Sequence, residues 1–206
     1  MQTFADPLER AVQVAGERRA LVSEGQTFSH RELRSRCRRL ASVLTAKGAE
    51  PGDRIAILAA NSHQFIESYV AIPAAGFVIV PLNTRHAEPE LRYALEDAGA
   101  TMLLSDRDPG SLRETVDTVI MIPDEYDSLL DGAEESELGE GVTEDSLAGL
   151  FYTGGTTGAS KGVMLTHRNL ISNTFHFMTM APPTSDSVFL IMAPLFHAAG
   201  SYGVLG

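Results

Sequence analysis

Short apolar runs alternate with segments of helical periodicity over the first 123 residues, and this alternation limits the possible folds more than any other feature. Four of the runs are predicted to be strands, at residues 54–60, 77–80, 101–104 and 117–122. Helices are predicted between them at residues 62–74 and 89–98. Strands that alternate with helices are typical of α/β proteins. We therefore predict an α/β fold with a mostly parallel sheet.

An earlier helix begins with a recognisable capping signal. Ser29 is followed three residues later by Glu32, the spacing of a capping box, and Gly48 marks the C-terminal end. Apolar residues recur between them at helical spacing, so Cys37 is expected to face the core and to be unreactive. As the single cysteine of the chain, it cannot form an internal disulfide, which fits a reducing compartment.

The acidity of the chain belongs to one segment. Of the net charge of −11, residues 105–146 contribute −12, from 14 acidic residues and two arginines, which leaves about +1 for all the rest. Without a basic stripe to neutralise phosphates, nucleic acid is a poor partner for this chain. A solvated surface and linker is the simplest interpretation of the acidic segment.

Neither a membrane span nor a secretory signal is apparent. No stretch approaches the roughly 20 apolar residues of a membrane-spanning helix, and the N-terminal residues mix charges with apolar side chains. We expect a cytoplasmic protein. Five histidines lack metal-ligand spacing and are predicted to be structural, so no metal site is predicted from them: His30, His63, His86, His167 and His176.

The stretch GLFYTGGTTGASKGVMLTHRNL, residues 149–170, carries the clearest chemical signal. A buried strand is predicted at residues 147–152, a loop at 153–162, a short return strand at 163–166 and a helix at 168–180. Glycines let backbone N–H groups approach a phosphate, hydroxyls add neutral donors, and Lys161 supplies a mobile positive charge. The chain has only one other lysine, Lys47. A polyphosphate is the predicted ligand of the loop.

The ordinary P-loop does not fit this stretch. Ser160 precedes the lysine where the P-loop needs glycine, and Gly162 follows it where the magnesium-binding hydroxyl should stand. The residues from Val163 continue as an apolar strand, whereas a P-loop leads into a helix.

The residues YTGGTTGASKGV, from Tyr152 to Val163, instead resemble the phosphate loop of AMP-forming adenylating enzymes, usually Tyr-Thr-Ser-Gly-Thr-Thr-Gly-x-Pro-Lys-Gly-Val. That family includes acyl-CoA synthetases, luciferases and the adenylation domains of peptide synthetases. Gly154 replaces the usual serine, which removes a possible phosphate donor, and Ser160 replaces the usual proline, which loosens the loop.

Two further stretches support the resemblance. VPLNTRHAEPELRYALEDAG, at residues 80–99, is similar to the segment in which PLN precedes a helix in acyl-CoA synthetases. PLFHAAG, at residues 194–200, resembles the motif beside the carboxylate and acyl pocket. The chain looks most like the fatty-acid–CoA ligases, although peptide-synthetase and luciferase relatives share the loop.

The resemblance implies a two-step ligase that uses ATP, Mg²⁺ and coenzyme A. A carboxylate, fatty or aromatic, attacks the α-phosphate of ATP to give acyl-AMP and pyrophosphate, and the acyl group then passes to coenzyme A. His197 is implied at the carboxylate as the catalytic residue. The residues implied to hold the phosphates are Thr153, Gly154, Gly155, Thr156, Thr157, Gly158 and Lys161.

The resemblance also implies three parts. Residues 1–123 would form a first α/β layer, 124–146 an acidic connection, and 147–206 the phosphate-loop segment with the start of the acyl-pocket subdomain. The family's adenine, ribose and magnesium motifs and its C-terminal lysine do not occur here, so we expect the N-terminal part of a larger ligase, inactive alone. The alternative is a truncated, non-catalytic nucleotide-binding or interaction module. The sequence carries no signal for an oligomeric state.

Overall fold

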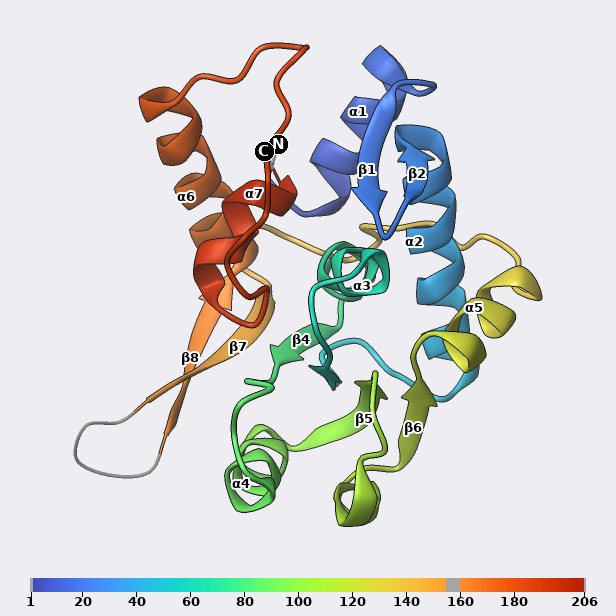
Figure 1. The fold of residues 1–206 in the computed structure, drawn as a ribbon, viewed down its shortest axis with the longest axis vertical. Helices are drawn as coiled ribbons and strands as arrows, with labels where there is room; N and C mark the ends of the chain where they lie inside the picture. Colours follow the sequence, from blue (N-terminus) through green and yellow to red (C-terminus); the bar gives the residue numbers. More distant parts are fainter. Residues whose placement is uncertain (1, 155–159, 206) are drawn as a thin grey trace.

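A six-stranded sheet forms the centre of the molecule (Figure 1). The computed structural model describes residues 2–154 and 160–205, and the strand order is β6-β5-β3-β4-β7-β8. The strands are β3 (Arg54–Leu58), β4 (Val78–Pro81), β5 (Ala100–Ser105), β6 (Thr118–Met121), β7 (Leu147–Thr153) and β8 (Lys161–Thr166). Neighbours pair in parallel from β6 across to β7, whereas β7 and β8 are antiparallel. The predicted α/β fold with a mostly parallel sheet is confirmed.

Helices connect the strands and lie on both faces of the sheet. They are α1 (Ala5–Ala15), α2 (His30–Ala46), α3 (His63–Ala74), α4 (Glu88–Ala98), α5 (Asp124–Asp131), α6 (His167–Met180) and α7 (Ser201–Leu205), with short 3₁₀ helices η1 (Gly110–Thr115) and η2 (Ala198–Gly200). A separate antiparallel hairpin consists of β1 (Arg19–Ser23) and β2 (Gln26–Ser29). The sequence analysis does not predict α1 or this hairpin.

Side chains alternate between two hydrophobic cores along the central strands. Ile55 and Ile57 of β3 belong to a core shared with α1, α2, α3 and α6. Ala56 and Leu58 belong to a second core, shared with α4 and η1. A strand that is buried on both faces must be apolar at every position, which explains the continuous apolar runs in the sequence.

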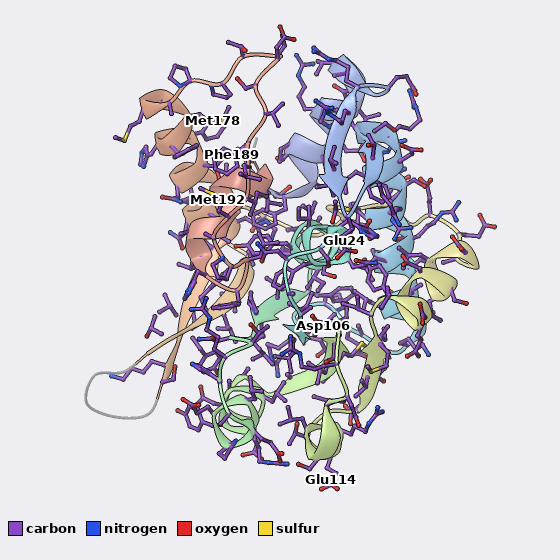
Figure 2. The ribbon with its side chains drawn as sticks, in the orientation of Figure 1. Glu24, Asp106, Glu114, Met178, Phe189 and Met192 are labelled. Atoms are coloured by element: carbon purple, nitrogen blue, oxygen red, sulfur yellow. The ribbon has the colours of Figure 1, made fainter. Side chains whose placement is uncertain are left out.

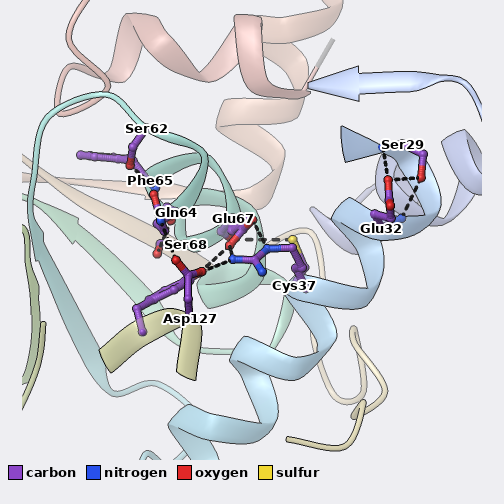
Figure 3. A network of polar contacts seen from close by, with 11 residues as sticks. Ser29, Glu32, Cys37, Ser62, Gln64, Phe65, Glu67, Ser68 and Asp127 are labelled. Atoms are coloured by element: carbon purple, nitrogen blue, oxygen red, sulfur yellow. Dashed lines mark hydrogen bonds and ion pairs between the residues drawn. The ribbon is translucent and has the colours of Figure 1, made fainter. Parts of the chain in front are cut away.

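The start of α2 confirms the predicted capping box. The Ser29 hydroxyl accepts a hydrogen bond from the Glu32 backbone N–H at 3.2 Å, and the Glu32 carboxylate accepts from the Ser29 backbone N–H at 2.7 Å (Figure 3). Cys37 on the same helix is fully buried, as predicted, and burial raises the pKa of its thiol. A thiol held in its neutral form is a poor nucleophile.

Helix α3 ends where the sequence predicts, and Pro73 lies inside its last turn. Ser62 caps its N-terminus by accepting a hydrogen bond from the Phe65 backbone N–H at 3.2 Å. The predicted range of residues 62–74 agrees with the observed end at Ala74. A proline near the end of a helix removes only one hydrogen bond there, and the mostly buried helix compensates by packing.

The acidic connection at residues 124–146 contains helix α5 and pairs with arginines of α2. Arg36 binds Asp127 of α5. Arg38 forms ion pairs with Glu135, at 3.6 Å, and with Glu137. These contacts give part of the acidic segment a structural role, because they attach it to the outer side of α2.

A buried carboxylate lies behind these surface pairs, between α2, α3 and α5 (Figure 3). Glu67 of α3 is fully buried and accepts hydrogen bonds from Arg36 Nε at 2.6 Å and from the Tyr126 hydroxyl at 2.9 Å. Burial raises the pKa of Glu67, while the guanidinium beside it opposes that change. The group joins three helices through one set of polar contacts.

Strand β7 enters the sheet beside β4 although 69 residues of chain separate the pair Ile79 and Gly149. A Cβ atom at Gly149 would stand 2.7 Å from a ring carbon of Phe151 and 3.2 Å from the Ile79 carbonyl oxygen. The close approach of the two strands therefore requires glycine at this position. Strands on either side of the acidic connection share one sheet as a result.

The surface around α6 exposes several large apolar side chains. Met178, Phe189 and Met192 lie on this side of the molecule, and the Phe177 and Phe189 rings meet edge to face (Figure 2). Met180 and Met192 are more than four-fifths exposed, at 87% and 81%. None of the helices in the described parts of the chain has the length and apolar character needed to cross a membrane.

Candidate functional site

A cavity of about 260 Å³ opens at the carboxyl ends of β4 and β7. Three segments that are distant in sequence line it. They are the residues that end and follow β4, the end of β7 with the first residue of the glycine-rich loop, and the PLFH segment; the wall includes Asn83, His86, Tyr152, Gly154, Phe196 and His197. In open α/β sheets, ligands bind in the crevice outside the carboxyl ends of the strands. Its position makes this cavity the candidate site.

The first wall of the cavity follows β4 and is shaped by Asn83. The Asn83 side-chain carbonyl accepts a hydrogen bond from the Arg85 backbone N–H, and its backbone carbonyl accepts from the His86 backbone N–H, both at 3.0 Å. This tight turn places His86 on the cavity wall, where its side chain is partly exposed. From the sequence, His86 is predicted to be structural, because it lacks metal-ligand spacing.

The second wall is held in place by a contact between β7 and α4. The Tyr152 hydroxyl donates a hydrogen bond to the Asp97 carboxylate at 2.7 Å. Burial, together with this carboxylate, raises the pKa of Tyr152. The phenol therefore stays neutral and acts as a fixed donor to Asp97, and its ring forms a rigid side of the cavity.

The base of the glycine-rich loop is closed by backbone pairing and by a serine. Thr153 pairs with Lys161 across β7 and β8, and the Ser160 hydroxyl donates a hydrogen bond to the Thr153 backbone carbonyl. Proline has no hydroxyl and could not form this bond. The loosening expected at Ser160 is therefore offset, because the serine joins the two ends of the loop.

Four of the predicted phosphate-binding residues lie outside the described residues: Gly155, Thr156, Thr157 and Gly158. Thr153, Gly154 and Lys161 flank them, and all three are exposed. No hydrogen bond or ion pair engages the Lys161 ammonium within the described part of the chain, so its charge is free for an anion. Open space surrounds the Cα of Gly154, since an added Cβ would meet nothing within 4 Å.

His197 stands on the third wall of the cavity. Its ring packs against Phe196, with centroids 4.5 Å apart, and its side chain is exposed while Phe196 is buried. The structure therefore brings His197 and Gly154 to one cavity, and it sets Thr153 beside the opening at the end of β7. Lys161 lies at the start of β8, across the hairpin from Thr153.

Three residues of the cavity wall are not predicted from the sequence to belong to the site. Asn83 and Tyr152 lie within the quoted motifs without a predicted role, and His86 is predicted to be structural. The turn residue Asn83, followed by a histidine at the third position, was the available signal for a wall after β4.

A parallel α/β sheet with a glycine- and threonine-rich loop beside a crevice at its carboxyl edge defines a nucleotide-binding α/β domain. Comparison with known sequences identifies the particular kind. The family described as AMP-binding enzyme matches residues 8–206, and the chain belongs to this family.

Relatives and solved structures agree with this assignment. Feruloyl-CoA synthase from an Amycolatopsis species is 37% identical over 198 residues, which cover 94% of this chain and 39% of that protein. The o-succinylbenzoate CoA synthetase of Bacillus subtilis, solved with its acyl-adenylate intermediate, superposes with a TM-score of 0.85 at 32% identity, covering 97% of this chain and 53% of the other. ATP-bound MatB from Rhodopseudomonas palustris gives a TM-score of 0.86 at 31% identity, covering 98% and 43%.

The chain thus spans about two fifths of the length of the curated relative. Its fold and loop place it among adenylate-forming enzymes, and more than half of the length of feruloyl-CoA synthase and of MatB lies beyond the matched region. Activity, substrates and partners of the whole protein are accordingly matters for proposal.

Proposed function

We propose that this chain contributes the phosphate loop and part of the acid site of an AMP-forming acyl-CoA synthetase. A carboxylate would attack the α-phosphate of ATP, releasing pyrophosphate and forming acyl-AMP, and the thiol of coenzyme A would then displace AMP. The observation that carries the proposal is that Gly154 and His197 line the same cavity. It would allow a carboxylate at His197 to reach a nucleotide held by the loop.

In this proposal, the residues of the chain act by positioning and by charge. Lys161, Thr153 and Gly154 flank the loop and would bind the β- and γ-phosphates with Gly155, Thr156, Thr157 and Gly158. The Lys161 ammonium, which has no partner among the described residues, would stabilise negative charge that moves toward pyrophosphate as the bond breaks. His197, exposed in the cavity, would donate a hydrogen bond to the incoming acid and orient it.

Magnesium would accompany ATP in this reaction. Among the described residues, no group of three or more histidine, cysteine, aspartate or glutamate side chains is arranged to hold a metal ion. Mg²⁺ is commonly bound through substrate phosphates with few protein ligands. We therefore assign none of these residues to the metal.

We propose a fatty or aromatic acid as the substrate, and coenzyme A as the acyl acceptor. The named relatives act on feruloyl and o-succinylbenzoyl groups, which supports an aromatic acid. The cavity of about 260 Å³ is small beside the roughly 300–1,000 Å³ of drug-sized ligand pockets, which favours a compact acid. A panel of aromatic and straight-chain acids, compared by kcat/KM, separates the two.

The test is acid-dependent exchange of pyrophosphate into ATP by the full-length gene product. Lys161→Ala should lower the exchange rate on the order of 10²-fold, the loss typical of removing one group that stabilises transition-state charge. Lys47→Ala is the matched control, because that lysine follows α2 and lies outside the cavity wall. Equal exchange by wild type and Lys161→Ala would contradict the proposed role of the loop.

Residues 1–206 alone are proposed to be inactive, since the family's adenine and ribose motifs do not occur in them. Sustained conversion of ATP to AMP by the isolated chain would contradict this. If the full-length wild type exchanges no pyrophosphate into ATP with any acid of the panel, that result would instead favour a nucleotide-binding or interaction module.

A further inference from the structure

The PLFH segment that carries His197 has no regular structure of its own before it reaches the cavity. Between the end of α6 and the start of η2 the chain forms neither helix nor strand. Its local hydrogen bonds are short-range, such as the His197 backbone N–H to the Pro194 carbonyl at 3.1 Å. Something outside the segment must therefore fix its position.

Leu195 and Phe196 are buried in the hydrophobic core, and Asn61 supplies the hydrogen bonds. Its side-chain carbonyl accepts a hydrogen bond from the Leu195 backbone N–H, and its side-chain N–H donates to the Ala193 backbone carbonyl, both at 2.9 Å. The two bonds bracket Pro194, the first residue of the turn that ends at His197. Within the described part of the chain, they are the hydrogen bonds that join residues 193–197 to the sheet.

The backbone of Asn61 is itself held from both sides. The preceding residue, Ala60, donates its backbone N–H to the Asp106 carboxylate at 2.6 Å, and the Asp106 backbone N–H donates to the Leu58 carbonyl at 3.1 Å (Asp106 is labelled in Figure 2). The following residue, Ser62, caps α3. Asn61 therefore stands at a rigid point between the carboxyl end of β3 and the start of α3.

A side-chain amide matches the hydrogen-bonding groups around Asn61. The Leu195 backbone N–H is a donor and the Ala193 carbonyl is an acceptor, and a carboxamide can pair with both at once. An ionised carboxylate would keep the first bond but set negative charge against the Ala193 carbonyl. Leucine, of similar size, would keep neither bond.

We infer that Asn61 is a positioning residue that fixes the PLFH segment, and with it His197, at the wall of the cavity. Its amide acts through the backbone on either side of Pro194, and Asn61 is not among the residues that line the cavity. The inference rests on the proposed function for its catalytic consequence, whereas the anchoring itself can be measured without any activity.

The first measurement is amide hydrogen exchange of residues 193–200 in the chain. Asn61→Leu should accelerate exchange there about tenfold, the change that two ordinary hydrogen bonds produce, while β3 keeps its protection. Asp186→Asn is the control, because Asp186 lies in the same irregular stretch and its ion pair with Arg18 is exposed. Unchanged exchange in Asn61→Leu would overturn the inference.

The second measurement is adenylation by the full-length gene product. In Asn61→Leu, kcat/KM for the acid should fall about tenfold while KM for ATP stays constant, since the loop after β7 is untouched. Faster exchange with unchanged kcat/KM would overturn the positioning role. If the wild type forms no acyl adenylate, the proposed function is contradicted. The amide hydrogen exchange of residues 193–200 still decides whether Asn61 anchors the PLFH segment.

Asn61→Asp provides a rescue test of the hydrogen bond that Asn61 donates to the Ala193 carbonyl. Protonation restores an O–H donor to the Ala193 carbonyl, so the ratio of variant to wild-type protection should rise as the pH falls toward about 5 and below. A pH-independent ratio would contradict the assigned donor.

Discussion

Acid should destabilise this protein through one buried histidine, His167, the first residue of α6. Its side chain is fully buried, and Nδ1 accepts a hydrogen bond from the Phe4 backbone N–H at 3.2 Å. Nε2 is buried without a hydrogen-bond partner among the described residues. Protonation at Nδ1 would set two N–H groups against each other. Burial lowers the pKa of His167 from 6.5 to about 4, although Asp6 opposes the change.

The magnitude follows from the two pKa values. Because the folded-state value lies below the ordinary one, the unfolded chain binds the proton first as the pH falls. Stability is unaffected above about pH 6.5 and is lost progressively between about 6.5 and 4. At pH about 5, the free energy of unfolding should be lower by about 2 kcal/mol than at pH about 7.5, with a full effect of about 3 kcal/mol.

Urea unfolding of the chain at a series of pH values measures this effect. Other groups titrate over the same range, so the comparison is with His167→Asn, whose side-chain carbonyl can still accept from the Phe4 backbone N–H. The variant should be less stable at pH about 7.5, because it loses ring packing against Phe4, and should lose about 2 kcal/mol less on acidification. Parallel stability curves for the two proteins would refute the assignment.

Two further predictions concern the packing behind the site. Arg36→Met should lower the free energy of unfolding by about 3–5 kcal/mol, because Glu67 is left buried without its cation, whereas Arg31→Met, at an exposed pair, should cost less than about 1 kcal/mol. Similar losses in both variants, measured by urea unfolding, would argue against the buried pair. Gly149→Ala should cost about 1–3 kcal/mol by crowding β4, while Gly132→Ala, where a Cβ has its nearest contact at 3.8 Å, should be close to neutral in thermal unfolding.

The strands and helices of the central sheet could be predicted because burial on both faces imposes long apolar runs with clear stops. The helix starts at Ser29 and Ser62 could be predicted because each serine caps its helix through hydrogen bonds with a residue only three positions away. Helix α5 escaped prediction because its apolar face is short, essentially Tyr126 and Leu130, within a strongly acidic run. It is held by contacts that are remote in sequence, namely the ion pair of Asp127 with Arg36 of α2 and the burial of Tyr126 and Leu130 in the core.

Site residues could be predicted only where they belong to one contiguous sequence motif. The motifs predict the loop and His197, and the structure places Gly154 and His197 on one cavity. His86 and Asn61 were not found, because their relation to His197 depends on the parallel packing of β3, β4 and β7. Such relations between strand ends are properties of the sheet and leave no local pattern.

Because β8 runs antiparallel to β7, the positive end of the α6 dipole lies far from Thr153 and Lys161, which flank the predicted phosphate loop. Thr153 and Lys161 pair at one end of the β7–β8 hairpin, and α6 begins at the far end of β8 (Figure 1). Six residues of strand separate them, roughly 20 Å. The macrodipole of a helix acts mainly within its first turn, so α6 adds almost nothing at that distance. In the proposed function, an anion at the loop is held by peptide N–H groups, threonine hydroxyls and Lys161, and the attraction of this exposed charge weakens as salt is added.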